Sequence, residues 1–454
     1  MAVIALALVG GSAQDQVDLI VYNATVVTMD ASGRVLPRGA VAIQGRNIVA
    51  VEPAEAIAAR YIAEETLDAG GQIVMPGLVN THTHAPMVLY RGLADDLALM
   101  EWLQKYIFPA EAKTVSPEFV RAGAKLAALE MIQSGTTTYT DMYYFEEEIA
   151  RVTKAAGLRG VLGQTVIQFP VADAKTPDEA LTRAESFLKE FTNDELIVPA
   201  LAPHAMYTLE AKTLKAVRQM ADRYNAPVLI HLAETADESK TSMQRHKMSP
   251  TRYLETLGFW KNRTVAAHAV WLSADDIAIL AKRNVGVSHN PESNMKLASG
   301  TAKVPALRQA GVAVGLGTDG AASNNDLDMF EAMRQAAFLH KLTTNDPRTL
   351  PARAVVGMGT IDGARALGMQ DQIGSLEPGK RADLIVVAAD GARQTPMYDP
   401  LSHLVYVARG DDVTTTIVNG KILMKDRKVM TLDEKAVIKD ANAYAARVRE
   451  AVAK

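Results

Sequence analysis

Two histidines spaced two positions apart, His82 and His84, are the first side chains of this sequence that could act together on one ligand. They close a stretch that predicts a β-strand, and residues i and i+2 of a strand face the same side. Both imidazoles can therefore share one metal ion. Taken alone, such a pair is a weak signal, because histidines at this spacing are often unrelated.

Further imidazole and carboxylate side chains follow other predicted strands. They are His231 with Glu234 three residues later, His268, and Asp319. His268 also suits a buried core position, and Asp319 also suits a helix cap. Their shared place at the carboxyl ends of strands nevertheless favours a common site, since barrel enzymes assemble their sites at those ends.

The histidines as a group support this interpretation. Six of the nine lie at or just beyond predicted strand ends: His82, His84, His204, His231, His268 and His289. We interpret the other three, His246, His340 and His403, as structural or surface residues.

Three imidazoles and one carboxylate form a nitrogen and oxygen shell suited to one divalent ion. Zn²⁺ is the first choice, and Fe²⁺ or Mn²⁺ also fit. The ion lowers the pKa of a bound water toward neutrality and makes a hydroxide nucleophile. Glu234 fits the general acid and base that hydrolysis needs. Asp319 can bind the metal and accept a proton, and His268 can orient the attacked group or be a fourth imidazole near the ion.

Composition limits the alternatives. The chain has 454 residues, 48% of them hydrophobic and 22% charged, which is ordinary for a globular protein. It has no cysteine, which excludes thiolate zinc sites, iron–sulfur clusters and a cysteine nucleophile. Its 48 basic and 52 acidic residues give a net charge of −4, so nothing attracts nucleic acid or an acidic membrane.

The centre of the chain alternates predicted strands with predicted helices. The strands begin near Leu78, Thr136, Gly160, Ile197, Val228, Thr264, Val285 and Val312. The last of the helices are expected at residues 327–340 and 352–367. Eight strands in this order predict a (β/α)₈ barrel over residues 76–373. An open doubly wound sheet is the alternative, but no glycine-rich phosphate loop follows the first strand.

The two ends of the chain predict a small β-sandwich, formed by residues 17–75 together with residues 374–454. Its strands are expected at residues 17–27, 40–51, 384–387, 405–408 and 414–418. Asn419 and Gly420 predict a hairpin turn, and a helix is expected at residues 433–453.

Residues 1–16 are expected to be a signal remnant or a tail. The apolar run at residues 2–10 is too short to span a bilayer. Small residues at Gly11 and Ala13 are placed for cleavage before Gln14, although a basic segment is missing. This pattern favours export to the periplasm over a cytoplasmic location.

Five motifs in fixed order resemble the amidohydrolase superfamily, and specifically its methylthioadenosine/S-adenosylhomocysteine deaminase branch. They are PGLVNTHTH at residues 76–84, HLAE at 231–234, SHNPESNMKL at 288–297, GTDGAASNN at 317–325 and LEPGKRADL at 376–384. The resemblance covers nearly the whole chain from about residue 17, and it implies the same barrel and sandwich.

The resemblance also implies roles for particular residues. One divalent metal would be bound by His82, His84, His231 and Asp319. Glu234 would carry a proton to a ring nitrogen and then to departing ammonia. His268 would contact the hydrolytic water and the substrate, Glu111 would hold ribose hydroxyls, and His204 would be a further substrate contact. A 6-aminopurine nucleoside would be converted to its inosine analogue, and the resemblance leaves a homo-oligomer open.

One position departs from the family pattern. Members that accept the homocysteine carboxylate resemble one another in an arginine near the end of the third strand, where this chain has Gln164. A neutral amide cannot form the bidentate, charge-assisted pair that arginine gives a carboxylate. We therefore expect Gln164 to contact substrate and to favour methylthioadenosine, adenosine or 5′-deoxyadenosine over S-adenosylhomocysteine.

Two other functions are weighed against this one. A different hydrolase on the same barrel, such as a guanine deaminase or an s-triazine chlorohydrolase, would use the same metal ligands. Glu234 favours deamination, because ammonia leaves only after protonation and chloride does not need it. A non-catalytic barrel that binds a metal or ligand does not explain a complete ligand set with a proton carrier beside it.

Overall fold

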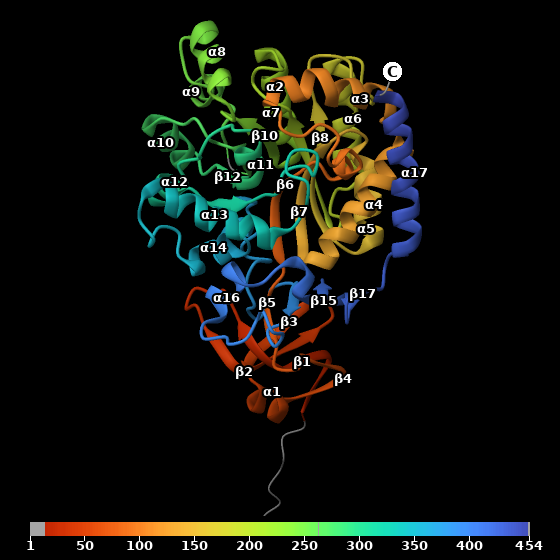
Figure 1. The fold of residues 1–454 in the computed structure, drawn as a ribbon, viewed down its shortest axis with the longest axis vertical. Helices are drawn as coiled ribbons and strands as arrows, with labels where there is room; N and C mark the ends of the chain where they lie inside the picture. Colours follow the sequence, from red (N-terminus) through yellow and green to blue (C-terminus); the bar gives the residue numbers. More distant parts are fainter. Residues whose placement is uncertain (1–13, 262, 453–454) are drawn as a thin grey trace, which may run out of the picture.

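The computed structural model describes residues 14–261 and 263–452, and the segment expected to direct export lies outside them. Eight parallel strands close into a barrel in the order β10-β11-β12-β13-β6-β7-β8-β9 (Figure 1). They are β6 (Leu78–Thr83), β7 (Thr136–Tyr143), β8 (Arg159–Val166), β9 (Ile197–Pro203), β10 (Val228–Leu232), β11 (Thr264–His268), β12 (Gly286–His289) and β13 (Val314–Leu316). The (β/α)₈ barrel predicted from the sequence is confirmed.

Helices cover the outside of the barrel. They are α4 (Pro117–Ser134), α5 (Glu146–Ala156), α6 (Pro177–Glu190), α7 (Ala211–Tyr224), α8 (Ala236–His246), α9 (Pro250–Thr256), α10 (Ala274–Lys282), α11 (Pro291–Lys296), α12 (Val304–Gln309), α13 (Met329–Thr344), α14 (Ala352–Met358) and α15 (Ile361–Ala366). Ser116, Thr176 and Ser273 begin three of them by accepting a hydrogen bond from a first-turn N–H. The single helix expected at residues 352–367 is broken at Gly359 and Thr360. No helix among the described residues is both long and apolar enough to cross a membrane.

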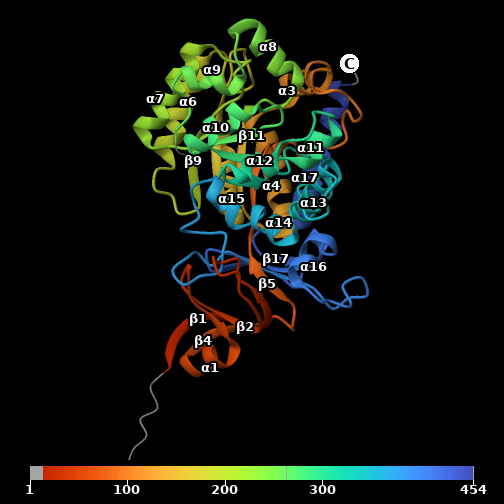
Figure 2. The same ribbon diagram turned by 90° about the vertical axis from the view of Figure 1, so that its left-hand side faces the viewer.

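Both ends of the chain form one mixed sheet of nine strands below the barrel (Figures 1 and 2). Its strands are β1 (Asp15–Val27), β2 (Val35–Gln44), β3 (Asn47–Pro53), β4 (Tyr61–Asp68), β5 (Ile73–Pro76), β14 (Leu384–Val387), β15 (Val413–Val418), β16 (Lys421–Lys425) and β17 (Lys428–Val429). Antiparallel pairing of β5 with β14 joins the two ends, with Met75 opposite Ile385. The sheet predicted from both termini is therefore present.

The strand that joins the two ends packs on both faces. Leu384 and Val386 of β14 belong to the core of the terminal sheet, while Ile385 and Val387 belong to the core shared with the barrel. This alternation is the period of two that a strand imposes on its side chains. Because both faces are buried, β14 reads as a continuous apolar run.

Two expectations for this sheet are wrong. Residues 40–51 form parts of two strands, because Gly45, at φ +58°, turns the chain back between β2 and β3. Residues 405–408 lie in and just after the helix α16 (Pro400–Tyr406), which Asp399 caps. Leu401, Leu404 and Val405 are buried at helical spacing, which a short apolar run does not distinguish from a strand.

The remaining elements lie at the mouth or on the side of the barrel, except the first, which packs on β2 and β3 of the terminal sheet. They are α1 (Ala54–Arg60), η1 (Ala85–Tyr90), α2 (Leu99–Trp102), η2 (Leu103–Ile107), α3 (Phe108–Thr114), η3 (Gly410–Asp412) and α17 (Glu434–Val452). The C-terminal helix α17 runs along the outside of the barrel beside α4 (Figure 1). Tyr444 meets the ring of Phe119 there at 5.9 Å between centroids.

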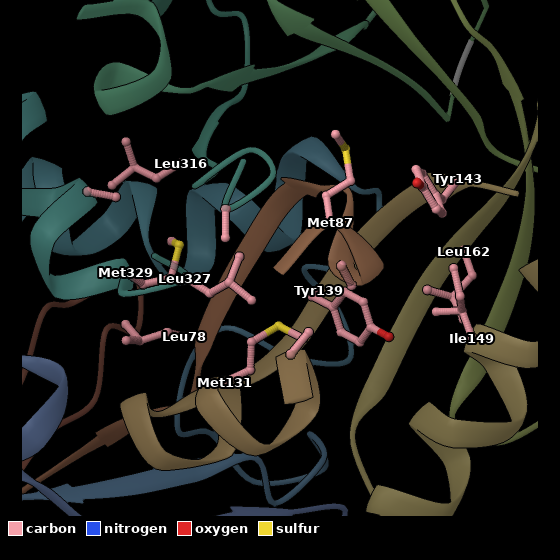
Figure 3. Close-up of a cluster of buried hydrophobic side chains, with 14 of the residues drawn as sticks. Leu78, Met87, Met131, Tyr139, Tyr143, Ile149, Leu162, Leu316, Leu327 and Met329 are labelled. Atoms are coloured by element: carbon pink, nitrogen blue, oxygen red, sulfur yellow. The ribbon is translucent and has the colours of Figure 1, made fainter. Parts of the chain in front are cut away.

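The barrel core lies between the strands and the outer helices. Leu78, Met131, Tyr139 and Leu162 meet there from β6, α4, β7 and β8 (Figure 3). Each large apolar side chain buried in this way contributes about 1.5–3 kcal/mol of stability. This packing fixes the strands whose carboxyl ends carry the candidate site.

Candidate active site

His82 and His84 point into the mouth of the barrel from the end of β6. Between them, Thr83 turns the other way, and its hydroxyl donates to the Thr140 carbonyl and the Asp141 carboxylate, each at 2.7 Å. His84 Nδ1 lies 2.8 Å from the carbonyl oxygen of Met142, so this nitrogen carries the proton. In the neutral ring, the lone pair is then on Nε2, which faces the mouth.

His231, at the end of β10, has the same arrangement. Its Nδ1 lies 2.8 Å from the carbonyl oxygen of His204, which again leaves the lone pair on Nε2. His231 Nε2 and His84 Nε2 face each other at 3.3 Å. Two lone pairs at this distance repel unless a cation or a proton lies between them.

Asp319 follows β13 and completes the group. Its Oδ1 lies 3.3 Å from His82 Nε2 and 3.4 Å from His84 Nε2, while Ser293 donates to its Oδ2 at 2.7 Å. Burial alone would raise the pKa of Asp319, but the imidazoles of His82, His268 and His84 outweigh burial and hold it well below its usual range. The carboxylate is therefore an anion in the midst of imidazoles.

These residues fit a divalent cation. The donor atoms of His82, His84 and Asp319 lie within 4.8 Å of one another, and so do those of His82, His231 and His268. His82 Nε2 is buried and has no hydrogen-bond partner. Burial lowers the pKa of His82 to about 4 and that of His84 below its usual value. Neutral imidazoles beside a carboxylate are a donor set that zinc, iron or manganese accepts.

His268 and Glu234 lie on the side of this group that faces the cavity. His268 Nε2 is 3.8 Å from Glu234 Oε2 and 3.9 Å from Asp319 Oδ2. Burial raises the pKa of Glu234. Burial lowers the pKa of His268, but the charges of Glu234 and Asp319 and a 2.9 Å bond between its Nδ1 and Asn294 raise it overall. The shifts in pKa therefore favour the protonated form of both groups.

Glu111 lies across the cavity, on α3. It is 7% exposed, and the hydroxyl of Tyr143 donates to its Oε1 at 2.7 Å. Burial raises the pKa of Glu111 to about 7, although the Tyr143 hydrogen bond opposes the shift. Tyr143 was not predicted as a site residue from the sequence, although it ends β7 and so lies where barrel sites form (Figure 3).

The other two histidines expected at strand ends, His204 and His289, lie in different surroundings. His204 follows β9, lines the cavity, and has its ring 4.8 Å from that of His231. His289 is fully buried below the cavity and pairs with His340 at 3.1 Å between the two Nε2 atoms.

Gln164 is not brought to the cavity. Its side chain is fully buried and donates to Asp173 Oδ2 at 2.8 Å, and Thr165 is the residue of β8 that lines the cavity instead. Successive side chains of a strand point to opposite faces, so a site at the end of β8 takes one of this pair. Gln164 is therefore not among the residues that line the cavity in this structure.

A cavity opens above these donor atoms. Its polar lining includes His84, His231, Glu234, His268 and Asp319, which form its polar wall. Its apolar lining consists of Met87, Leu99, Trp102, Leu103, Ile107, Phe108, Met142 and Leu297. This mixture suits a flat, largely apolar molecule whose reacting atom meets the polar side chains.

A second groove continues from the cavity past Glu111. The two share Phe108, Glu111 and Tyr144, and the groove is otherwise lined by Gln104, Pro109, Ala112, Phe169, Pro170, Val171, Ala172 and Lys175. Phe108 and Phe169 lie at the junction, with ring centroids 5.5 Å apart. A ligand held at Glu111 would therefore extend an apolar group toward this groove.

Comparison with known proteins agrees with this geometry. A model of the amidohydrolase family matches residues 73–423. The chain is 48% identical over 416 residues to a 5-methylthioadenosine/S-adenosylhomocysteine deaminase of Syntrophobacter fumaroxidans, covering 92% of this chain and 95% of that protein. It is 47% identical to a 5′-deoxyadenosine deaminase of Methanosarcina barkeri, covering 94% and 98%.

A solved structure is similar as well. An adenosine deaminase from Xanthomonas campestris with bound zinc superposes with a TM-score of 0.95 and is 40% identical. The match covers 96% of this chain and all of that one.

Proposed function

This chain belongs to the amidohydrolase family, and from that membership and its site we propose that it hydrolytically deaminates 6-aminopurine nucleosides to their 6-oxo analogues and ammonia. The observation that carries the proposal is the convergence of His84 Nε2 and His231 Nε2, at 3.3 Å, beside the Asp319 carboxylate and within reach of Glu234. That arrangement would hold a cation next to a proton carrier, which is what expelling ammonia requires.

We assign the metal to His82, His84, His231 and Asp319, and we propose zinc as its identity. Three neutral imidazoles and one carboxylate form a zinc-type donor set, and the similar adenosine deaminase is a zinc-bound protein. When bound, the ion supplies Lewis acidity that lowers the pKa of a water molecule toward neutrality.

Glu234 moves the protons of the reaction. Its raised pKa lets it accept a proton from the attacking water and release the proton to a ring nitrogen. The second proton of the water, from the hydroxyl now on the attacked carbon, then reaches the amino group through Glu234, and the C–N bond breaks to release ammonia. His268, 3.8 Å from Glu234, orients the water and the attacked carbon. Asp319, whose pKa the imidazoles hold well below its usual range, would stay ionised as a metal ligand.

The cavity holds the nucleoside by its two ends. The base lies against the polar wall with its 6-amino group at Glu234, and His204 contacts the base from the end of β9. Glu111 accepts hydrogen bonds from the ribose hydroxyls while Tyr143 fixes its carboxylate. The 5′ substituent then reaches the apolar groove of Phe169 and Val171.

The groove determines which nucleosides fit best. A methyl or methylthio group gains from contact with apolar walls, whereas a zwitterionic amino acid side chain loses hydration there. Lys175 is the one basic residue among those that line the groove, at its rim. We therefore rank methylthioadenosine and 5′-deoxyadenosine above S-adenosylhomocysteine.

An ultraviolet assay tests the proposal, because deamination changes the absorbance of adenine nucleosides. The panel is adenosine, 5′-deoxyadenosine, methylthioadenosine, S-adenosylhomocysteine, guanine and a chlorotriazine, with metal analysis of the same preparation. We expect about one zinc per chain and turnover of the adenine nucleosides. Turnover restricted to guanine or the chlorotriazine, or full activity in a metal-free preparation, would overturn the proposal.

A further inference from the structure

Glu238 is buried beside the proton carrier, although no part of the reaction described above uses it. It lies at the third position of α8, where its N–H donates to Thr235 Oγ1 at 3.2 Å. Its carboxylate turns back along the chain, so that Oε1 accepts the N–H of Ala233 and Oε2 accepts the N–H of Glu234, both at 3.0 Å. One carboxylate thus holds two consecutive peptide groups.

The chain needs this support because it leaves the strand abruptly. β10 ends at Leu232, and Ala233 has a left-handed φ of +48°, which an alanine adopts at a cost. The N–H groups of Ala233 and Glu234 therefore have no partner from the strand or from α8. Buried N–H groups without a partner destabilise a fold, so an acceptor has to come from a side chain.

The peptide group of Ala233 is also hydrogen-bonded to the segment that follows β11. The carbonyl oxygen of Ala233 accepts the N–H groups of Val270, at 3.2 Å, and Trp271, at 2.9 Å. That segment begins directly after His268. Glu238 therefore fixes the segment that carries Glu234, and hydrogen bonds join this segment to the one that follows His268.

Another helix gives an internal comparison. In α10, Asp276 occupies the third position and returns its carboxylate to the N–H and hydroxyl of the capping Ser273, at 2.8 and 2.7 Å. That is an ordinary capping box, which satisfies the helix itself. In α8 the third-position carboxylate instead reaches the two residues before the cap, and one of them is Glu234.

We propose that Glu238 is a positioning residue for the deamination, whose carboxylate fixes the backbone of Ala233 and Glu234 and thereby aims the Glu234 side chain at the substrate. The inference rests on the proposed role of Glu234. It concerns orientation, because Glu238 is not among the residues that line the cavity, and the hydrogen bonds of its carboxylate among the described residues go to the backbone of Ala233 and Glu234.

Glu238→Gln is the first test, since it keeps the size of the side chain but replaces one acceptor oxygen with an NH₂ group that faces an N–H. We expect kcat to fall about 10- to 100-fold, as for other residues that orient catalytic groups. KM and metal content should change less than about twofold. Asp237→Asn is the matched control, because Asp237 is the neighbouring carboxylate with a side chain 80% exposed, and its kcat should stay at the wild-type value.

A double-mutant cycle separates positioning from general damage. If Glu238 acts through Glu234, Glu238→Gln should change the residual kcat of Glu234→Gln less than about twofold. Equal losses in both backgrounds, or wild-type kcat in the single variant, would overturn the inference. If Glu238→Gln fails to fold, Glu238→Asp replaces it. The shorter carboxylate reaches only one of the two N–H groups, so the loss of kcat should be intermediate.

Amide hydrogen exchange read by mass spectrometry gives a result that does not depend on turnover. The peptide that contains Ala233 and Glu234 should exchange faster in Glu238→Gln than in the wild type, while a peptide from β7 stays unchanged. Equal exchange would overturn the inference. Wild-type protein without deaminase activity but with this exchange difference would contradict the proposed function and leave the backbone clamp standing.

Discussion

At the end of the barrel that faces the terminal sheet lies a buried ion pair whose charged groups are hydrogen-bonded. Arg159 Nε donates to Asp383 Oδ2 at 3.1 Å, and both side chains are 2% exposed. The backbone N–H of Asn419 donates to Asp383 Oδ1 at 2.7 Å. At the opposite end, the buried His82 Nε2 has no hydrogen-bond partner, and the Nε2 atoms of His84 and His231 face each other.

The backbone carries strain at the mouth. Ala233, His268 and Asp319 adopt left-handed φ values of +48°, +70° and +64° there. Each such residue costs about 1–3 kcal/mol. At the other end, Gly135 and Gly157 make the turns before β7 and β8 free of steric cost, although Arg263, directly before β11, has a left-handed φ of +61°. The strained residues at the mouth thus include two candidate site residues, His268 and Asp319.

Replacing Glu234 at the mouth should have the largest effect. Glu234→Gln removes the proton carrier, so kcat should fall by about 10²- to 10⁴-fold with the metal retained. The unfolding temperature should stay the same or rise, because the variant no longer buries an ionisable carboxyl whose pKa burial has raised. Steady-state kinetics and calorimetry measure the two. Near-wild-type kcat would remove the assigned role.

Breaking the ion pair at the sheet end should lower stability and leave kcat unchanged. Asp383→Ala leaves Arg159 buried without its counter-charge and should lower the free energy of unfolding by about 3–5 kcal/mol, while kcat per folded molecule stays unchanged. Chemical denaturation measures the loss. The control is the double replacement Arg159→Met with Asp383→Leu, which should lose less than the single variant. A loss of kcat in fully folded Asp383→Ala would contradict the separation of the two ends.

Glu111 should make KM depend on pH, with an effect of moderate size. Its pKa is raised to about 7, so the carboxyl is mostly protonated at pH 6 and mostly ionised at pH 8. Ribose hydroxyls donate to the ionised form, so KM should fall as pH rises through 7. Glu111→Gln should raise KM at pH 8 by about tenfold and remove this dependence.

The same shift affects stability. Because the pKa of Glu111 in the folded protein lies above its usual value of 4.5, ionisation opposes folding as pH rises from 4.5 through 7. Glu111→Gln should therefore be stabilised relative to the wild type at pH 8 and less so at pH 5. A KM that does not respond to pH in the wild type would contradict the role given to Glu111.

An exposed pair at the sheet end should have the smallest effect. Arg46 and Glu195 lie 2.6 Å apart, but their side chains are 52% and 45% exposed. Arg46→Ala should lower the free energy of unfolding by less than about 1 kcal/mol, and the difference should shrink in high salt. Denaturant titrations at low and high salt check it. A loss as large as that of Asp383→Ala would mean that burial does not govern the value of charge pairs here.

The sequence predicted the barrel strands well because most of them are short apolar runs between helices, although β7, which reads TTTYTDMY, is not. The strand prediction failed where a short apolar run fits a strand and a helix equally well. Val405 is the example, since it lies in a helix capped by Asp399. Gln164 was expected at the cavity because a position at a strand end does not say which of two neighbouring side chains faces the site, and Thr165 faces it. Glu238 carried no sequence signal, since its partners are backbone groups.

The amino-acid sequence by itself determined the chemistry that is available. Without cysteine, a metal can be held only by nitrogen and oxygen donors, and the order of strands placed His82, His84, His231 and Asp319 at strand ends. Only the tertiary structure decided that these donors converge. The closed barrel brings β6, β10 and β13 around one mouth, and hydrogen bonds to carbonyl oxygens turn the Nε2 atoms of His84 and His231 toward each other. Those bonds join residues distant in the chain, because folding creates them and no local pattern records them.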